Sequence, residues 1–185
     1  MSQVGMLFLF YEYAKWHLKY PSFTNWSNSS MNQVFVSSCL LGESVRYDAS
    51  SRKYHHPFLE ELIFRKLIIS ICPEVLGGLS VPRPAAEFSQ NRVINITQVD
   101  VTAEFNRGAK LTWDQALKHQ VKMAILKANS PSCSNHQIYD GSFQGKLITG
   151  KGITAELLIK NGIRVFNELQ LDKAQRYYQE NYKAL

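Results

Sequence analysis

The sequence predicts an α/β fold, with an open, mostly parallel sheet and helices on both of its faces, in a single domain. Four short apolar runs of strand character carry this prediction, at residues 34–38, 67–71, 121–127 and 164–168. Segments of helical periodicity lie between or after them. Because strands that are joined through helices need crossover connections, neighbouring strands should lie parallel. The run at 67–71 is apolar throughout, as strands of a parallel sheet are when both faces are buried.

The first helix is predicted at 55–66, between the first two strands. Pro57 suits a first helical turn, because its missing N–H has no partner to lose there. Glu60 and Glu61 favour the positive end of the helix dipole. The predicted apolar face of this helix consists of Phe58, Leu59, Leu62 and Ile63.

The later elements follow from the same signals. A helix opens at Thr112, where Thr112 and Gln115 form a candidate capping box. Gly162 is a suitable residue to follow a helix end. The remaining elements are the helix at 112–120, a Gly-punctuated loop or short hairpin at 138–152, a helix at 154–161 and a terminal helix at 172–185.

Three parts of the chain differ in character. Residues 1–30 are rich in aromatic side chains and end in a polar stretch, which suggests either a helical extension or translation from an upstream start. Residues 31–170 form the predicted α/β domain, of Rossmann-like type, and residues 171–185 a C-terminal helix. The apolar stretch near the start lacks a basic flank and a cleavage site and is too short to span a bilayer. We therefore expect a cytoplasmic protein with no membrane partner.

Charge and cysteine count limit the possible functions. The 185 residues carry a net charge of +6, which permits a polyanionic partner such as RNA. Because the basic residues are scattered rather than clustered, RNA is possible but not favoured. The three cysteines cannot all pair in disulfides within one chain. In a reducing compartment they would be free to bind metal.

Each cysteine follows one of the predicted strands. Cys39 closes VFVSSC, Cys72 closes LIISIC, and Cys133 lies a few residues beyond the strand at 121–127. Since ligands bind beyond the carboxyl ends of strands in open α/β sheets, three thiolates could converge there. Separate buried thiols, a zinc site and a cysteine nucleophile are alternatives. An iron–sulfur cluster with one open iron fits the count of three better.

Two other residues stand beside these cysteines. Glu74 lies two residues beyond Cys72, and a carboxylate at the mouth of the sheet can act as a general acid or base. Pro131 holds Ser130 in an extended conformation, which would aim its hydroxyl into the same mouth. Further along, Arg83 is predicted to pair with Glu87 in a structural salt bridge.

Six ordered motifs carry a family resemblance that spans roughly residues 33–168. They are SSCLLGESVRYD (37–48), CPEVLGGLSVPRPAAE (72–87), DVTAEFNRGA (100–109), ILKANSPSCS (125–134), IYDGSF (138–143) and GKGITAELLIKNGIRVFNE (150–168). On these motifs the chain resembles the thiouracil desulfidase family.

The resemblance implies a cofactor, a substrate and roles for five residues. It implies a 4Fe–4S cluster bound by Cys39, Cys72 and Cys133, with the fourth iron open for the sulfur of a thiolated pyrimidine. Glu74 would act in acid–base catalysis and Ser130 would assist at the substrate. The implied reaction converts C=S to C=O, with release of sulfide and no net redox change. A non-enzymatic cluster-binding module, or a protein acting on thiouridine in RNA, is the alternative.

Two positions depart from the family pattern. Ser134 stands where the family commonly has Gly, and it would strain the cysteine loop if that position required a positive φ. Ala49 also stands where Gly is more common. Related longer proteins that act on tRNA carry a second domain, and none follows residue 185 here. The resemblance therefore favours a free base or nucleoside as substrate.

Overall fold

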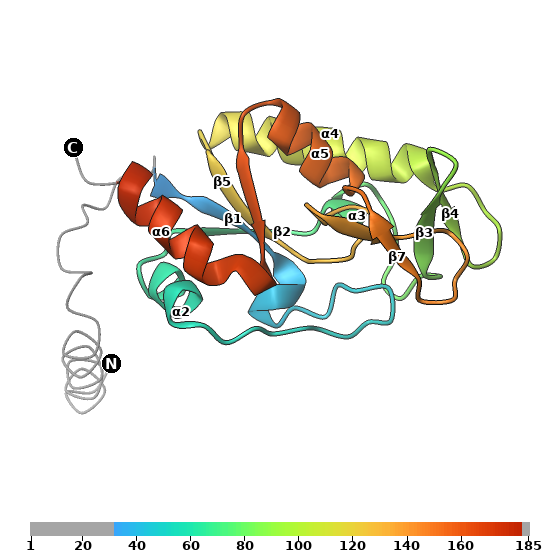
Figure 1. The fold of residues 1–185 in the computed structure, drawn as a ribbon, viewed down its shortest axis with the longest axis horizontal. Helices are drawn as coiled ribbons and strands as arrows, with labels where there is room; N and C mark the ends of the chain where they lie inside the picture. The colour runs from blue at the N-terminus through green and yellow to red at the C-terminus, as the bar shows by residue number, and fades with distance from the viewer. Residues whose placement is uncertain (1–31, 183–185) are drawn as a thin grey trace.

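Four parallel strands form a sheet in the order β2-β1-β5-β8. The computed structural model describes residues 32–182, and Figure 1 shows its fold. Their bounds are Val34–Ser37 for β1, Ile68–Ile71 for β2, Met123–Leu126 for β5 and Arg164–Asn167 for β8. The chain leaves β1 toward β2 on one side and later returns to β5 on the other. The open parallel sheet is confirmed, and the strand order reverses at β1. The extension predicted for residues 1–30 lies outside the described residues.

Helices cover both faces of this sheet, as predicted. One face carries α2 (Pro57–Phe64) and α6 (Leu171–Asn181), and the other carries α4 (Thr102–Lys118) and α5 (Ile153–Lys160). Side chains alternate along each strand, so neighbouring residues of β1 enter different cores. None of the helices within residues 32–182 combines the length and the apolar character that crossing a bilayer requires.

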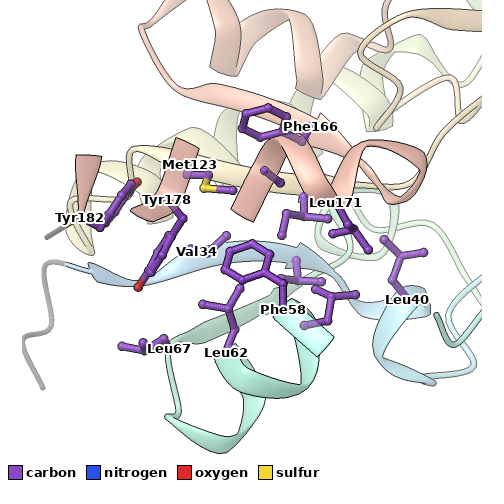
Figure 2. Close-up of a cluster of buried hydrophobic side chains, with 14 of the residues drawn as sticks. Val34, Leu40, Phe58, Leu62, Leu67, Met123, Phe166, Leu171, Tyr178 and Tyr182 are labelled. Carbon is purple, nitrogen blue, oxygen red and sulfur yellow. The ribbon is translucent and has the colours of Figure 1, made fainter. Parts of the chain in front are cut away.

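The core beneath α2 and α6 combines aliphatic side chains with packed aromatic rings (Figure 2). The ring of Phe58 lies 5.5 Å from that of Tyr178, which stacks on Tyr182 at 4.5 Å between ring centroids. The Tyr178 hydroxyl donates a hydrogen bond to the carbonyl of Asn32, 2.8 Å away. The predicted C-terminal helix is thereby fixed to the start of β1 as part of the core.

The helix predicted at 112–120 is only the second half of a longer one. Helix α4 begins at Thr102, where the Asp100 carboxylate accepts the Thr102 backbone N–H at 2.9 Å. The capping box predicted at Thr112 is wrong, since Thr112 is buried inside the helix and its hydroxyl donates to the Gly108 carbonyl. The predicted start at Thr112 therefore lies inside the helix, whose first residue is Thr102.

Shorter elements stand beyond the carboxyl ends of the strands, where Figure 1 shows two hairpins. Strands β6 and β7 form a short hairpin, one of the two alternatives expected for 138–152, whereas the β3–β4 hairpin was not predicted. Their bounds, with those of the short helices, are Ser38–Leu41 (η3), Pro73–Leu76 (α3), Ala86–Ser89 (β3), Arg92–Asn95 (β4), Gln137–Tyr139 (β6), Leu147–Thr149 (β7) and Glu168–Gln170 (η4).

Candidate active site

A cavity of about 600 Å³ opens at the carboxyl edge of the sheet. Its wall is built from the segments that directly follow β1, β2 and β5, with further residues from β3 and from the β6–β7 hairpin. This is the place where open α/β sheets bind ligands. The site residues that the sequence predicted all line it: Cys39, Cys72, Glu74, Ser130 and Cys133.

The three cysteines reach the cavity from three different strands. Cys39 lies in η3 immediately after β1, Cys72 lies between β2 and α3, and Cys133 lies in the turn after β5. All three are free thiols, two of them buried. The Ser37 hydroxyl donates a long hydrogen bond to the Cys133 sulfur, at 3.6 Å. The end of β1 thus carries Cys39 and also supports the Cys133 thiol, which comes from the turn after β5.

Burial disfavours the ionised form of these thiols. It raises the pKa of the Cys39 thiol to about 11, and repulsion from Cys72 adds to that shift. Burial is also the first cause of the raised pKa values of Cys72 and Cys133. A bound metal centre would supply the positive charge that stabilises the three thiolates.

The donor set fits a cluster better than a single ion. Among residues 32–182, no three His, Cys, Asp or Glu side chains are arranged to hold one metal ion. A cluster binds each thiolate through a different iron, so its ligands stand farther apart than those of a single zinc. Three separate thiols around one cavity meet that requirement.

Glu74 is held by two neighbours. Arg83 Nη2 and Nε lie 2.7 and 3.1 Å from Glu74 Oε2, while the Ser130 hydroxyl lies 3.3 Å from Glu74 Oε1. Arg83 is almost buried and also donates to the carbonyl of Val45. The prediction that Arg83 pairs with Glu87 is therefore wrong. The turn at α3 brings Glu74 to the Arg83 guanidinium in space, although Glu87 is nearer to Arg83 in sequence.

Ser130 also organises the turn that carries Cys133. Its Oγ accepts the backbone N–H groups of Ser132 and Cys133, each at 3.1 Å. The hydroxyl hydrogen remains available for Glu74, so one side chain links the cysteine turn to the carboxylate. The sequence predicted that Ser130 points into the mouth, and the structure places it there.

Sequence reasoning missed a second ion pair in the cavity wall. Lys127 pairs with the buried Glu168, whose other oxygen accepts the Ala128 N–H at 2.7 Å. Lys127 Nζ also donates to the carbonyl of Ala128, at 3.1 Å. Both charged residues follow the ends of strands β5 and β8. That shared position at the carboxyl edge was the signal that could have identified them.

The two departures from the family pattern have different outcomes. Ser134 does not adopt a positive φ, and its hydroxyl donates to the carbonyl of Gln137 at 2.6 Å, so the expected strain is absent. Ala49 does adopt a positive φ, of 56°, in the loop beside the cavity. Of the two substitutions, only Ala49 occupies a backbone conformation that favours Gly.

Fold and site together define an α/β protein whose open parallel sheet carries three free cysteines and a carboxylate around one cavity at its carboxyl edge. A model of the 2-thiouracil desulfurase family matches residues 34–170, and the chain belongs to this family. The resemblance drawn from the motifs is confirmed.

Two similar proteins support this assignment. The chain is 38% identical over 149 residues to the uncharacterized protein YbbK of Bacillus subtilis (strain 168), covering 75% of this chain and 97% of that protein. It is 42% identical to a solved structure described as the 4Fe–4S-dependent thiouracil desulfidase TudS, with a TM-score of 0.77. That match covers 78% of this chain and 96% of the other. The cofactor predicted here is the one named for that structure.

Proposed function

We propose that this protein is a 4Fe–4S-dependent desulfidase that converts a thiolated pyrimidine to its oxo form with release of sulfide. The substrate would be 2- or 4-thiouracil or a related nucleoside. One observation carries the proposal: in a member of the 2-thiouracil desulfurase family, three free cysteines share a cavity with a carboxylate that contacts a serine hydroxyl.

Cys39, Cys72 and Cys133 would hold the cluster through their thiolates. When bound, the cluster supplies one iron without a protein ligand, a Lewis acid for the sulfur of the substrate. Ser37 would support the site by its hydrogen bond to the Cys133 sulfur. All three cysteines of the sequence are used in this assignment, and none is in a disulfide. This agrees with action in the reducing cytoplasm.

Glu74 would accept a proton from the attacking water, and Ser130 would orient that water or the substrate. Arg83 occupies the other oxygen of Glu74 and fixes the direction of the carboxylate. The oxygen of the water forms the new bond to the ring carbon, and the bond from that carbon to sulfur breaks. Both protons of the water leave with the sulfur as hydrogen sulfide. The carbon keeps its oxidation state, so no electron donor or acceptor is required.

Two alternative functions would make a different use of the cavity or of the net charge of the chain. A non-enzymatic cluster carrier would bind iron without turning over thiolated bases. A protein acting on thiouridine in RNA would use the net charge of +6 to attract its substrate. The cavity lies at the edge of one sheet and encloses Glu74 and Ser130, which favours a small substrate.

The test begins with anaerobic purification. The expected protein is brown, absorbs near ~400 nm as thiolate-bound iron–sulfur centres do, and releases sulfide from 2- or 4-thiouracil. Glu74→Ala should keep the cluster and lose the reaction. A colourless protein without iron after reconstitution would refute both cluster functions. An iron-loaded wild-type protein without turnover of thiouracil, thiouridine or thiolated tRNA would indicate the carrier.

A further inference from the structure

Glu87 is a nearly buried carboxylate with no cation beside it. It lies in β3, exposes 9% of its surface, and forms part of the cavity wall. Arg83, the partner that the sequence suggested, is bound to Glu74 instead. Within residues 32–182 no Lys, Arg or His forms an ion pair with Glu87. A buried carboxylate needs hydrogen-bond donors in place of a cation.

One oxygen of Glu87 has such donors. Oε2 accepts the backbone N–H groups of Gly141 and Phe143, both at 3.0 Å. Phe143 has a φ of 57°, a left-handed conformation that is unfavourable for an aromatic residue and needs support from its surroundings. The loop 140–146 connects β6 to β7 and brings Gly145 to the cavity. Glu87 therefore fixes this part of the wall.

The other oxygen, Oε1, has no hydrogen-bond donor among the described residues. It is not sealed from solvent either, because within 32–182 the only buried side-chain oxygen or nitrogen without a partner belongs to Tyr182. Oε1 therefore belongs to the part of Glu87 that solvent can reach, and Glu87 lines the cavity. A carboxylate oxygen only accepts hydrogen bonds, so this position fits an N–H or O–H of a ligand.

A pyrimidine of the uracil type offers the matching donor. Its N3–H lies between C2 and C4, next to either carbon that can carry the sulfur. N1 is the atom that bears ribose in a nucleoside, so N3–H is the ring donor that bases and nucleosides share. Building on the proposed function, we propose that Glu87 Oε1 accepts N3–H of the thiolated pyrimidine and selects uracil-type over cytosine-type rings. A cytosine ring presents an unprotonated N3 there, and two acceptors would face each other.

Binding of oxo pyrimidines to the cluster-loaded protein tests this without any sulfur contact. We expect uracil and 1-methyluracil to bind alike in calorimetry, and 3-methyluracil and cytosine to bind at least about tenfold more weakly. Glu87→Gln keeps an oxygen for the loop and turns an NH2 group to the cavity. This variant should weaken the binding of uracil and 1-methyluracil at least about tenfold and remove the preference for uracil over cytosine. Absence of measurable uracil binding by the wild type would overturn the proposal.

Two further variants separate recognition from support of the loop. A Cβ on Gly141 would lie 2.8 Å from the Phe88 carbonyl oxygen. Gly141→Ala should therefore displace the loop and weaken the binding of all four pyrimidines equally. The same equal loss in Glu87→Gln would reduce Glu87 to a structural residue and overturn the proposal. Glu156→Gln, on the exposed face of α5, should change nothing.

Two further outcomes concern the ribose and the reaction. If Glu87→Gln weakened the binding of uridine but not that of uracil, Glu87 would contact the ribose hydroxyls, and the proposal would be overturned. If the wild type carries its cluster but desulfurates no thiolated base, the proposed function fails. The binding pattern of the four pyrimidines still decides whether Glu87 reads N3–H.

Discussion

Arg83 donates two hydrogen bonds to a single oxygen of Glu74, from Nη2 at 2.7 Å and from Nε at 3.1 Å. The other oxygen of Glu74 is left to the Ser130 hydroxyl. Arg83 also donates to the carbonyls of Ser80 and Val45, so the guanidinium is itself held in place. The consequence is a carboxylate with one oxygen held by Arg83 and the other in contact with the Ser130 hydroxyl, in the wall of the cavity.

Arg83→Lys should impair turnover while the cluster stays bound. A lysine keeps the positive charge but loses the planar pair of donors that orients Glu74. We expect kcat to fall between about tenfold and a hundredfold, the range that a small misplacement of a reacting group produces. The measurement is sulfide release per iron-loaded chain, with absorption near ~400 nm as the check on the cluster. Arg92→Lys, at an exposed ion pair, is the control. Full activity in Arg83→Lys would contradict the positioning role.

Ser130→Ala should weaken both the cysteine turn and catalysis. Two backbone N–H groups lose their acceptor, and Glu74 loses the hydroxyl on its free oxygen. We expect the free energy of unfolding to fall by about 1–2 kcal/mol, with lower iron content and lower kcat. Urea unfolding and iron analysis measure the first two quantities. Ser130→Thr retains a hydroxyl and should recover most of the stability. If Ser130→Ala matches the wild type in iron content, the turn does not depend on this side chain.

The main sheet could be predicted from the sequence because its signals are local. Each strand is a short apolar run, and the helix at 57–64 carries Pro57 at its start. The start of α4 at Thr102 was missed because its N-terminal half contains Gly108, which lowers helix propensity. The reason for that glycine is the approach of another segment, which no local pattern reveals.

The same contrast between local signals and tertiary contacts holds for the site. Cys39, Cys72 and Cys133 could be brought together because parallel strands end at one edge, a rule that needs no distances. The partner of Arg83 could not be predicted, since both Glu74 and Glu87 are near it in sequence. Only the turn at α3 and the hairpin of β3 decide between them.

Ala49→Gly should stabilise the protein. Ala49 is exposed and has a φ of 56°, where a Cβ is unfavourable and Gly is not. The gain is partly offset by the greater freedom of Gly in the unfolded chain, so we expect up to about 1 kcal/mol in the free energy of unfolding. Ala103→Gly, on the exposed side of α4, should instead lower it by up to about 1 kcal/mol. Urea denaturation of both variants gives the comparison, and equal signs would refute this account.

Two glycines let α3 and α4 approach closely. A Cβ on Gly108 would lie 2.0 Å from the carbonyl oxygen of Pro73, and one on Gly77 would lie 2.1 Å from that of Glu104. Both contacts involve backbone, which cannot rotate away as a flexible side chain could. The close packing holds α3, and with it the segment that carries Cys72 into the cavity.

Gly108→Ala should therefore disturb the active site, although Gly108 itself does not line the cavity. The added methyl group must push α3 away from α4, and such overpacking costs about 1–3 kcal/mol of stability. Since α3 begins next to Cys72 and contains Glu74, iron content and kcat should fall together with stability. Gly162→Ala is the matched control, because a Cβ there meets no atom within 4 Å and only the positive φ opposes it. That variant should lose about 1 kcal/mol and keep its iron and its kcat. If Gly108→Ala lowers stability but leaves both iron content and kcat intact, the position of α3 does not govern the site.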